Sequence, residues 1–187
     1  MSAPRTIARR IVLRLDPAQP HDRALASAMH LARAFHAELA ARMISDTRFA
    51  GAFALGDVSG HGGIAQDIET QLRRAETNLR RTLSALAAGE DTSWSFEVVR
   101  CAGILTHECS MTTDDLVAIE VPRVAVAAAE LRNEVADALA HARGVLLFPS
   151  TERISRGPVV VIAGDRHGAS RLIEESGKIA EALGAPL

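Results

Sequence analysis

The chain has 187 residues, of which 48% are apolar and 24% charged, and its formal net charge is −2. This length suits one domain of ordinary size plus part of another, and the composition is that of a folded protein rather than a disordered one. The arginines are spread along the chain, the apolar runs are far shorter than a membrane helix requires, and the N-terminus lacks the apolar core of a signal peptide. We therefore expect no nucleic acid or membrane partner and a cytoplasmic location.

Five short apolar segments are predicted strands because they are mostly rich in β-branched residues and are bounded by turn signals. They are residues 11–16 (IVLRLD), 38–44 (ELAARMI), 95–101 (SFEVVRC), 115–120 (DLVAIE) and 144–149 (GVLLFP).

Apolar residues that recur every three or four positions predict helices between these strands. The predicted helices are a segment from Asp22, a possible N-cap, to Phe35, a long one over 68–86, a short one over 104–112 and an alanine-rich one over 124–141. Residues 45–67 hold five glycines and no clear period, so they are predicted to be a long loop. The alternation predicts an α/β fold with an open, mostly parallel five-stranded sheet and helices on both faces, of the Rossmann-like type.

The end of the chain repeats its beginning. The run VVVIAGD (159–165) resembles IVLRLD, and the segment after it matches the first helix, with Ile179 lying 148 residues after Leu31. Only eight residues, STERISRG, lie between GVLLFP and PVVVIAGD, whereas a parallel crossover needs about a dozen or more. We therefore expect that 159–163 is not a routine sixth parallel strand.

The order of segments, the LD and AGD strand ends, the passage LARAFHAEL and the ending NEVADALAHARGVLLFP together resemble the universal stress protein family. The resemblance covers residues 10–150 as one repeat, and 158–187 resemble the start of a second repeat, as in tandem members. It implies a domain at 1–150, a linker at 151–157 and an incomplete repeat at 158–187. Because a lone strand and helix cannot bury enough apolar surface to be stable alone, we expect this unit to pack on the first domain or on another subunit. The end at APL, where a second strand would begin, suggests a degenerate tandem protein or a piece of a longer one.

In ATP-binding members of that family, a glycine loop after the fourth strand, G-x2-G-x9-G-[S/T], wraps the phosphates, because glycine lets backbone N–H groups approach an anion closely. This chain has no glycine between Gly103 and Gly144, and Arg132 and Asn133 stand where the last G-[S/T] would be. The replacement is a good helix former, and Glu120 and Glu130 would add negative charge near a triphosphate. The resemblance therefore does not carry ATP binding with it.

Asp16 and Ile44 match positions that flank adenosine in nucleotide-binding members, so they are the candidate cofactor-binding residues if any nucleotide binds. An aspartate at a strand end also makes an ordinary turn or cap. The other glycine cluster, SGHGG (59–63), precedes the long helix and could hold phosphate at the helix N-terminus. Its spacing matches neither the Rossmann nor the P-loop pattern, which favours a flexible loop.

Cys101 and Cys109 are expected to be buried thiols, although their spacing also permits a disulfide. His107 and Glu108 precede Cys109 directly, so on a helix the three side chains diverge and do not jointly chelate a metal.

His21, beside Asp22, and His167, near Asp165, recur after equivalent strand ends. They are expected to be exposed loop residues, with a shared polar pocket as the alternative. No serine or cysteine has a neighbouring base at a recognisable spacing, so the sequence predicts no catalytic residues, no metal and no cofactor.

These observations favour a non-enzymatic universal-stress-like protein, a regulatory or stress-response module that forms homodimers or binds a protein partner and has lost ATP binding. The alternative is an ATP- or AMP-binding signalling switch that uses a different phosphate loop, for which SGHGG is the candidate. An enzyme of a related nucleotide-binding α/β family would need a catalytic or phosphate motif that the sequence lacks.

Overall fold

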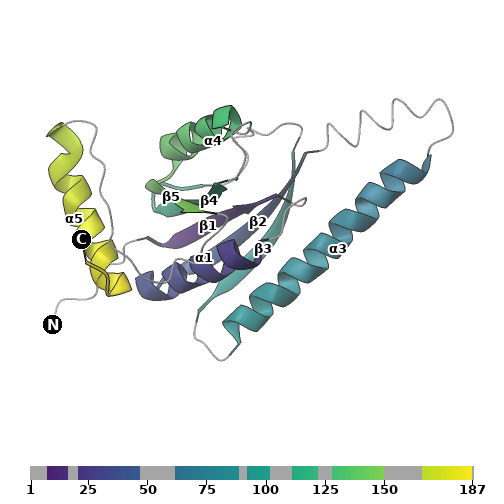
Figure 1. Cartoon of the computed structure of the whole chain (residues 1–187), viewed down its shortest axis with the longest axis horizontal. Coiled ribbons are helices and arrows are strands. Elements are labelled where there is room, and N and C mark those ends of the chain that lie inside the picture. Colours follow the sequence, from purple (N-terminus) through teal and green to yellow (C-terminus); the bar gives the residue numbers. More distant parts are fainter. Residues whose placement is uncertain are drawn as a thin grey trace.

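The computed structural model describes residues 8–16, 21–46, 62–88, 92–101, 111–121, 128–149 and 166–186 (Figure 1). The strands are β1 (Arg10–Leu15), β2 (Glu38–Asp46), β3 (Trp94–Cys101), β4 (Asp115–Val121) and β5 (Gly144–Pro149). The helices are α1 (Asp22–Phe35), α3 (Gly62–Ala87), α4 (Ala128–His141) and α5 (Arg166–Leu183). Among the described helices, none is long and apolar enough to cross a membrane.

The strands form one sheet in the order β3-β2-β1-β4-β5, and every neighbouring pair is parallel. The predicted α/β class and the five-stranded parallel sheet are confirmed. The chain moves outward from β1 to β3 and then returns to place β4 on the other side of β1, so the strand order reverses between β1 and β4. Ligands of open α/β sheets bind beside the carboxyl ends of the strands at such a reversal, the topological switch point.

Helices cover both faces of the sheet, as predicted (Figure 1). Alternate residues of β4 show the two layers: Leu116 and Ala118 belong to the main core with α1 and α3, whereas Val117 and Ile119 face α4. The main core is large because α1 contributes a full apolar stripe and α3 adds two leucines. The smaller core under α4 leaves room for polar side chains on that face.

The start of α1 differs from the expectation. Asp22 is the first helical residue and not the N-cap, a position that His21 occupies without a side-chain capping bond. An acidic residue in the first turn still interacts favourably with the helix dipole, so Asp22 remains suited to its position. The His21 side chain is left free to make contacts elsewhere.

Several boundaries also differ from the predicted ones. β2 continues to Asp46 and α3 begins at Gly62, so the predicted loop over 45–67 is shortened at both ends, and 47–61 lie outside the described residues. Met111 and Thr112 are not helical, while the rest of the predicted short helix lies outside the described part. Periodicity of apolar side chains locates the middle of an element better than its ends, because the last turn or pair of residues contributes little to the buried stripe.

The C-terminal end of α5 has the same backbone conformation as the C-terminal end of α1. In α1, His36 has a φ of 52°, and the N–H groups of His36 and Ala37 donate to carbonyls three and five residues earlier at 3.1 and 2.8 Å. At the end of α5, Gly184 has a φ of 60°, and the N–H groups of Gly184 and Ala185 make the same two bonds at 3.1 and 2.8 Å. Both ends are Schellman motifs, and the sequence repeat at these positions is therefore matched by backbone conformation.

α5 lies against α1, and its residues Ile179 and Leu183 pack on the main core. The helix begins directly after residue 165, earlier than the predicted match with α1. The predicted strand at 159–163, which would precede it, lies outside the described residues. That 158–187 form an incomplete second repeat, which packs on the first domain or on another subunit, stays a prediction.

Candidate functional site

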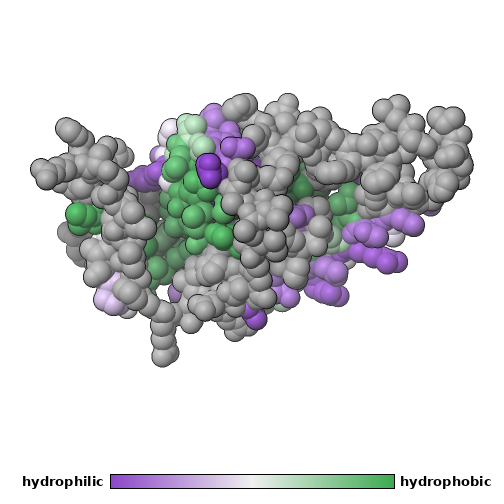
Figure 2. All heavy atoms as spheres, turned by 45° about the horizontal axis from the view of Figure 1, so that its top comes forward, coloured by the Kyte–Doolittle hydropathy of each residue, from purple (hydrophilic) through white to green (hydrophobic). Residues whose placement is uncertain are grey.

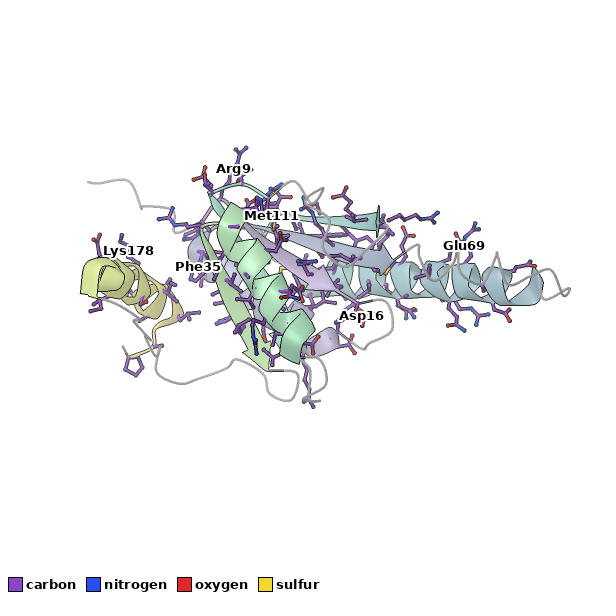
Figure 3. The ribbon with its side chains drawn as sticks, turned by 90° about the horizontal axis from the view of Figure 1, so that it is seen from above. Arg9, Asp16, Phe35, Glu69, Met111 and Lys178 are labelled. Atoms are coloured by element: carbon purple, nitrogen blue, oxygen red, sulfur yellow. The ribbon has the colours of Figure 1, made fainter. Side chains whose placement is uncertain are left out.

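The candidate site lies at the carboxyl ends of β1 and β4, where the strand order reverses. Asp16 directly follows β1, Glu120 is the next-to-last residue of β4, and His21 directly precedes α1. Figure 3 shows Asp16 at this end of the sheet, beside α4. We call Arg14, Asp16, His21, Glu120 and Glu134 the switch-point cluster.

His21 bridges the two strand ends. Its Nδ1 lies 2.9 Å from Oε2 of Glu120, and its Nε2 lies 2.5 Å from the backbone carbonyl oxygen of Asp16. The His21 side chain is only 3% exposed and that of Glu120 11%. Both ring nitrogens thus face oxygen acceptors, and the doubly protonated imidazole is the form that donates to both. The expectation that His21 is an exposed loop residue is wrong.

Arg14 and Glu134 form the second pair of the cluster, with Arg14 Nε 3.1 Å from Glu134 Oε1. Burial raises the pKa of the Glu134 carboxyl, and repulsion from the carboxylates of Asp137 and Asp16 raises it further, while Arg14 opposes both effects. Since a second and a third carboxylate act on Glu134, this end of the sheet carries a concentration of negative charge beside α4.

A row of charges continues from the cluster across the sheet. Arg14 on β1 is the register partner of Arg42 on β2, which in turn is the partner of Glu97 on β3. Arg42 Nε lies 3.3 Å from Glu97 Oε2, and the Arg42 side chain is 5% exposed. Sequence reasoning missed both arginines, although a charged residue inside an apolar strand is the signal that could have identified them.

The predicted residues Asp16 and Ile44 lie on adjacent strands. Leu15 and Met43 are register partners, so the residues that follow them emerge next to each other at the carboxyl edge of the sheet. Asp16 is exposed and Ile44 partly buried. Their role toward a nucleotide stays a prediction.

The segment that the resemblance aligns with the glycine loop is helical, as predicted: Arg132 and Asn133 lie within α4, and both are exposed. The carboxylate of Glu120 belongs to the switch-point cluster, while the side chain of Glu130 lies outside the described part. Of the SGHGG cluster, Gly62 and Gly63 form the start of α3, and 59–61 are not described.

The remaining candidates are not tested. His107, Glu108, Cys109 and Asp165 lie outside the described residues, as do the side chains of Cys101 and His167. Within the residues that are described, no group of three His, Cys, Asp or Glu side chains is arranged to hold a metal ion.

No protein-family profile matches the sequence, and no curated protein matches it. Among solved structures, the chain is similar to a universal stress protein in complex with cAMP, with 16% sequence identity and a TM-score of 0.46. The match covers 77% of this chain and 98% of that chain. A likeness of this degree assigns neither a family nor a ligand to this chain.

Proposed function

We propose that this chain is a non-enzymatic, universal-stress-like interaction module of the cytoplasm, with a regulatory or stress-related role, that forms homodimers and does not bind ATP. The family assignment depends on the sequence resemblance and is consistent with the fold. The loss of ATP binding and the self-association are supported by separate parts of the structure.

Helix α4 carries the argument against ATP. A phosphate loop needs backbone N–H groups that are free to point at an anion. In α4 the pattern of an α-helix commits the N–H groups of Arg132 and Asn133 to carbonyls one turn earlier. The two positions that would correspond to the last G-[S/T] of the loop therefore lack the donors that a triphosphate requires.

The switch-point cluster supports the same conclusion. The buried His21 ring already joins the strand ends at the reversal through the carboxylate of Glu120 and the backbone carbonyl of Asp16, and the carboxylates of Asp16 and Asp137 act on Glu134 at the same end of the sheet. Glu134 retains Arg14 as its ion-pair partner. A nucleotide at this end of the sheet would bring phosphate charge toward these carboxylates, which is electrostatically unfavourable.

The edge of the sheet at β5 supports self-association. In the described sheet β5 has a neighbour on one side, β4, and its Leu147 is 50% exposed. Leu139 of α4 is 57% exposed, and it lies about 140° around the helix from Glu134, which faces β1. Leu139 therefore belongs to the flank of α4 that faces the β5 edge.

Figure 2 shows hydrophobic residues gathered over the region of β5 and α4. An edge strand with exposed apolar neighbours is a place where another strand can pair. A second copy that presented the same edge would extend the sheet and cover both leucines, since a two-fold interface uses one patch on both subunits.

Nucleotide binding is tested by thermal unfolding and titration calorimetry of the full chain with Mg-ATP, AMP and cAMP. A ligand at about one hundred times its dissociation constant adds about 2.7 kcal/mol to the free energy of unfolding. We expect no saturable shift. A saturable shift with any of the three would favour the nucleotide-dependent switch instead.

Self-association is tested by light scattering after size exclusion. The variant Leu147→Glu places a charge at the β5 edge, and Ile173→Glu places one on α5, where Ile173 is 52% exposed. We expect a dimer for the wild type and for Ile173→Glu, and a monomer for Leu147→Glu. The reverse pattern would assign association to α5, and a monomeric wild type would reject self-association.

A further inference from the structure

The contacts of His21 define what kind of group the switch-point cluster accepts. Both hydrogen-bonding edges of the ring are met by oxygen acceptors, the carboxylate of Glu120 on one and the carbonyl of Asp16 on the other. A group that satisfies both must carry hydrogen-bond donors on opposite sides, and a planar ring of this size meets that need with two N–H groups on opposite edges. Neutral imidazole has one such donor, whereas the imidazolium ion has two.

The electrostatics of the position select the same class of group. Glu120 carries a carboxylate whose side chain is only 11% exposed, and the carboxylates of Asp16 and Asp137 act on nearby Glu134. The one arginine of the cluster, Arg14, is paired with Glu134. A cation at the His21 ring position is thus favoured, and an anion such as phosphate is disfavoured.

The ring is also more deeply buried than a turn residue usually is. The side chain of His21 is 3% exposed although its backbone lies at the junction between β1 and α1. The ring makes no capping bond to α1, and its position is set by two groups on different strands. Those two groups therefore form a position that the ring fills.

We propose that the switch-point cluster is a binding position for a small planar cation with N–H donors on opposite edges, and that His21 is its built-in occupant. External groups of this class are imidazolium, amidinium and guanidinium ions. This inference does not depend on the proposed function, because it concerns only the contacts of the ring and requires neither dimerisation nor loss of ATP binding.

The test removes the occupant and supplies it from solution. Glycine is a suitable replacement because it adopts the backbone angles of the N-cap residue, φ −117° and ψ 9°, without strain. Glycine is also one of the residues that N-caps tolerate well. Thermal unfolding of His21→Gly is measured with increasing imidazole near neutral pH at constant ionic strength. The wild type and the double variant His21→Gly/Glu120→Gln are measured in parallel.

We expect a saturable rise in the unfolding midpoint of His21→Gly alone. At ten times its dissociation constant imidazole adds about 1.4 kcal/mol, or about 3 to 6 °C for a chain of this size. The wild type should not respond, because its position is filled, and the double variant should respond less, because the charge is lost. Equal responses of the wild type and His21→Gly, or no response of either, would overturn the proposal.

If His21→Gly does not fold without imidazole, the experiment instead measures whether added imidazole restores folding. Far-UV circular dichroism then follows His21→Gly and His21→Asn, which retains one N–H donor group, as imidazole is added. Recovery in His21→Gly at lower imidazole concentrations than in the double variant supports the proposal. If imidazole restores folding in neither single variant, the proposal is rejected.

Discussion

The guanidinium of Arg10 holds the carboxylate of Asp115 through two contacts, Nε to Oδ1 at 3.0 Å and Nη2 to Oδ2 at 2.6 Å. The backbone N–H of Thr112 donates a third bond to Oδ2 at 2.8 Å. Asp115 is fully buried, and the pair joins the amino-terminal ends of β1 and β4, at the opposite end of the sheet from His21 and Glu120. The two central strands are thus joined by polar contacts at both ends.

Stability should decrease in acid because of Asp115. Burial alone would raise the pKa of this carboxyl, but the bonds from Arg10 and Thr112 outweigh burial and lower it. A lowered pKa in the folded state gives a stabilisation that is present above the unfolded value, about 3.9, and is lost as the pH falls through the folded one.

Urea unfolding of the wild type and Asp115→Asn between neutral pH and about pH 3 checks this expectation. The stability difference between the two proteins should be largest near neutral pH and should shrink below about pH 4. The exposed neighbour provides the control, since Asp114→Asn should leave the pH dependence unchanged. A constant difference across the range would contradict the assignment to Asp115.

Removing Arg10 alone should destabilise the fold more than removing both partners. Arg10→Met leaves a buried carboxylate without its ion-pair partner, a change that typically costs about 3 to 5 kcal/mol. In Arg10→Met/Asp115→Leu no charge is left buried, so part of that loss should be recovered. The double-mutant cycle is measured by denaturant unfolding, and simple addition of the two single effects would argue against coupling.

Arg33 should contribute to stability by joining two helices. Its Nη2 donates to the carbonyl oxygen of Leu86 at 2.6 Å, near the end of α3, where carbonyls lack helical partners. Arg33→Met keeps most of the apolar stem and removes the donor, so we expect a loss of about 1 to 3 kcal/mol.

Hydrogen exchange should locate the effect of Arg33→Met in the last turn of α3. Arg73→Met is the matched control, because Arg73 is exposed and its ion pair among the described residues is with Glu69, one turn away on the same helix. Equal protection of α3 in Arg33→Met and the wild type would show that the bond is not needed to hold the helix end.

The two equivalent helix ends should respond in opposite directions to substitution. His36 and Gly184 both have positive φ, and nothing lies within 4 Å of a Cβ built on Gly184. Gly184→Ala should therefore destabilise by about 1 kcal/mol through backbone strain alone. His36→Gly relieves that strain, but glycine loses more conformational entropy on folding than histidine does. The two effects partly cancel, so this variant should be neutral or more stable by roughly 0.5 kcal/mol.

Thermal unfolding measures the stability changes of His36→Gly and Gly184→Ala, with Gly177→Ala as a control. Gly177 lies inside α5 without a positive φ, and a Cβ added there would meet no atom within 4 Å, so alanine should stabilise the helix. Destabilisation by His36→Gly greater than that by Gly184→Ala would show that the His36 side chain makes a contribution of its own.

Much of this protein follows from local sequence pattern. The alternation of β-branched runs with helical stripes is sufficient to predict the element types, the parallel α/β class and the helix that contains Arg132 and Asn133. The match between Leu31 and Ile179 likewise pointed to a repeat, whose helix ends then proved to share one backbone conformation. These properties depend on residues close together in the chain, and periodicity reports them directly.

The candidate site, by contrast, was decided by tertiary structure. His21 and Glu120 are 99 residues apart, and nothing in either local sequence predicts that they meet. Arg14 and Arg42 likewise become neighbours only through the register between β1 and β2. Which strands are adjacent depends on how the whole chain buries its apolar faces, so the burial of His21 and the charges around it could be known only once the strand order was known.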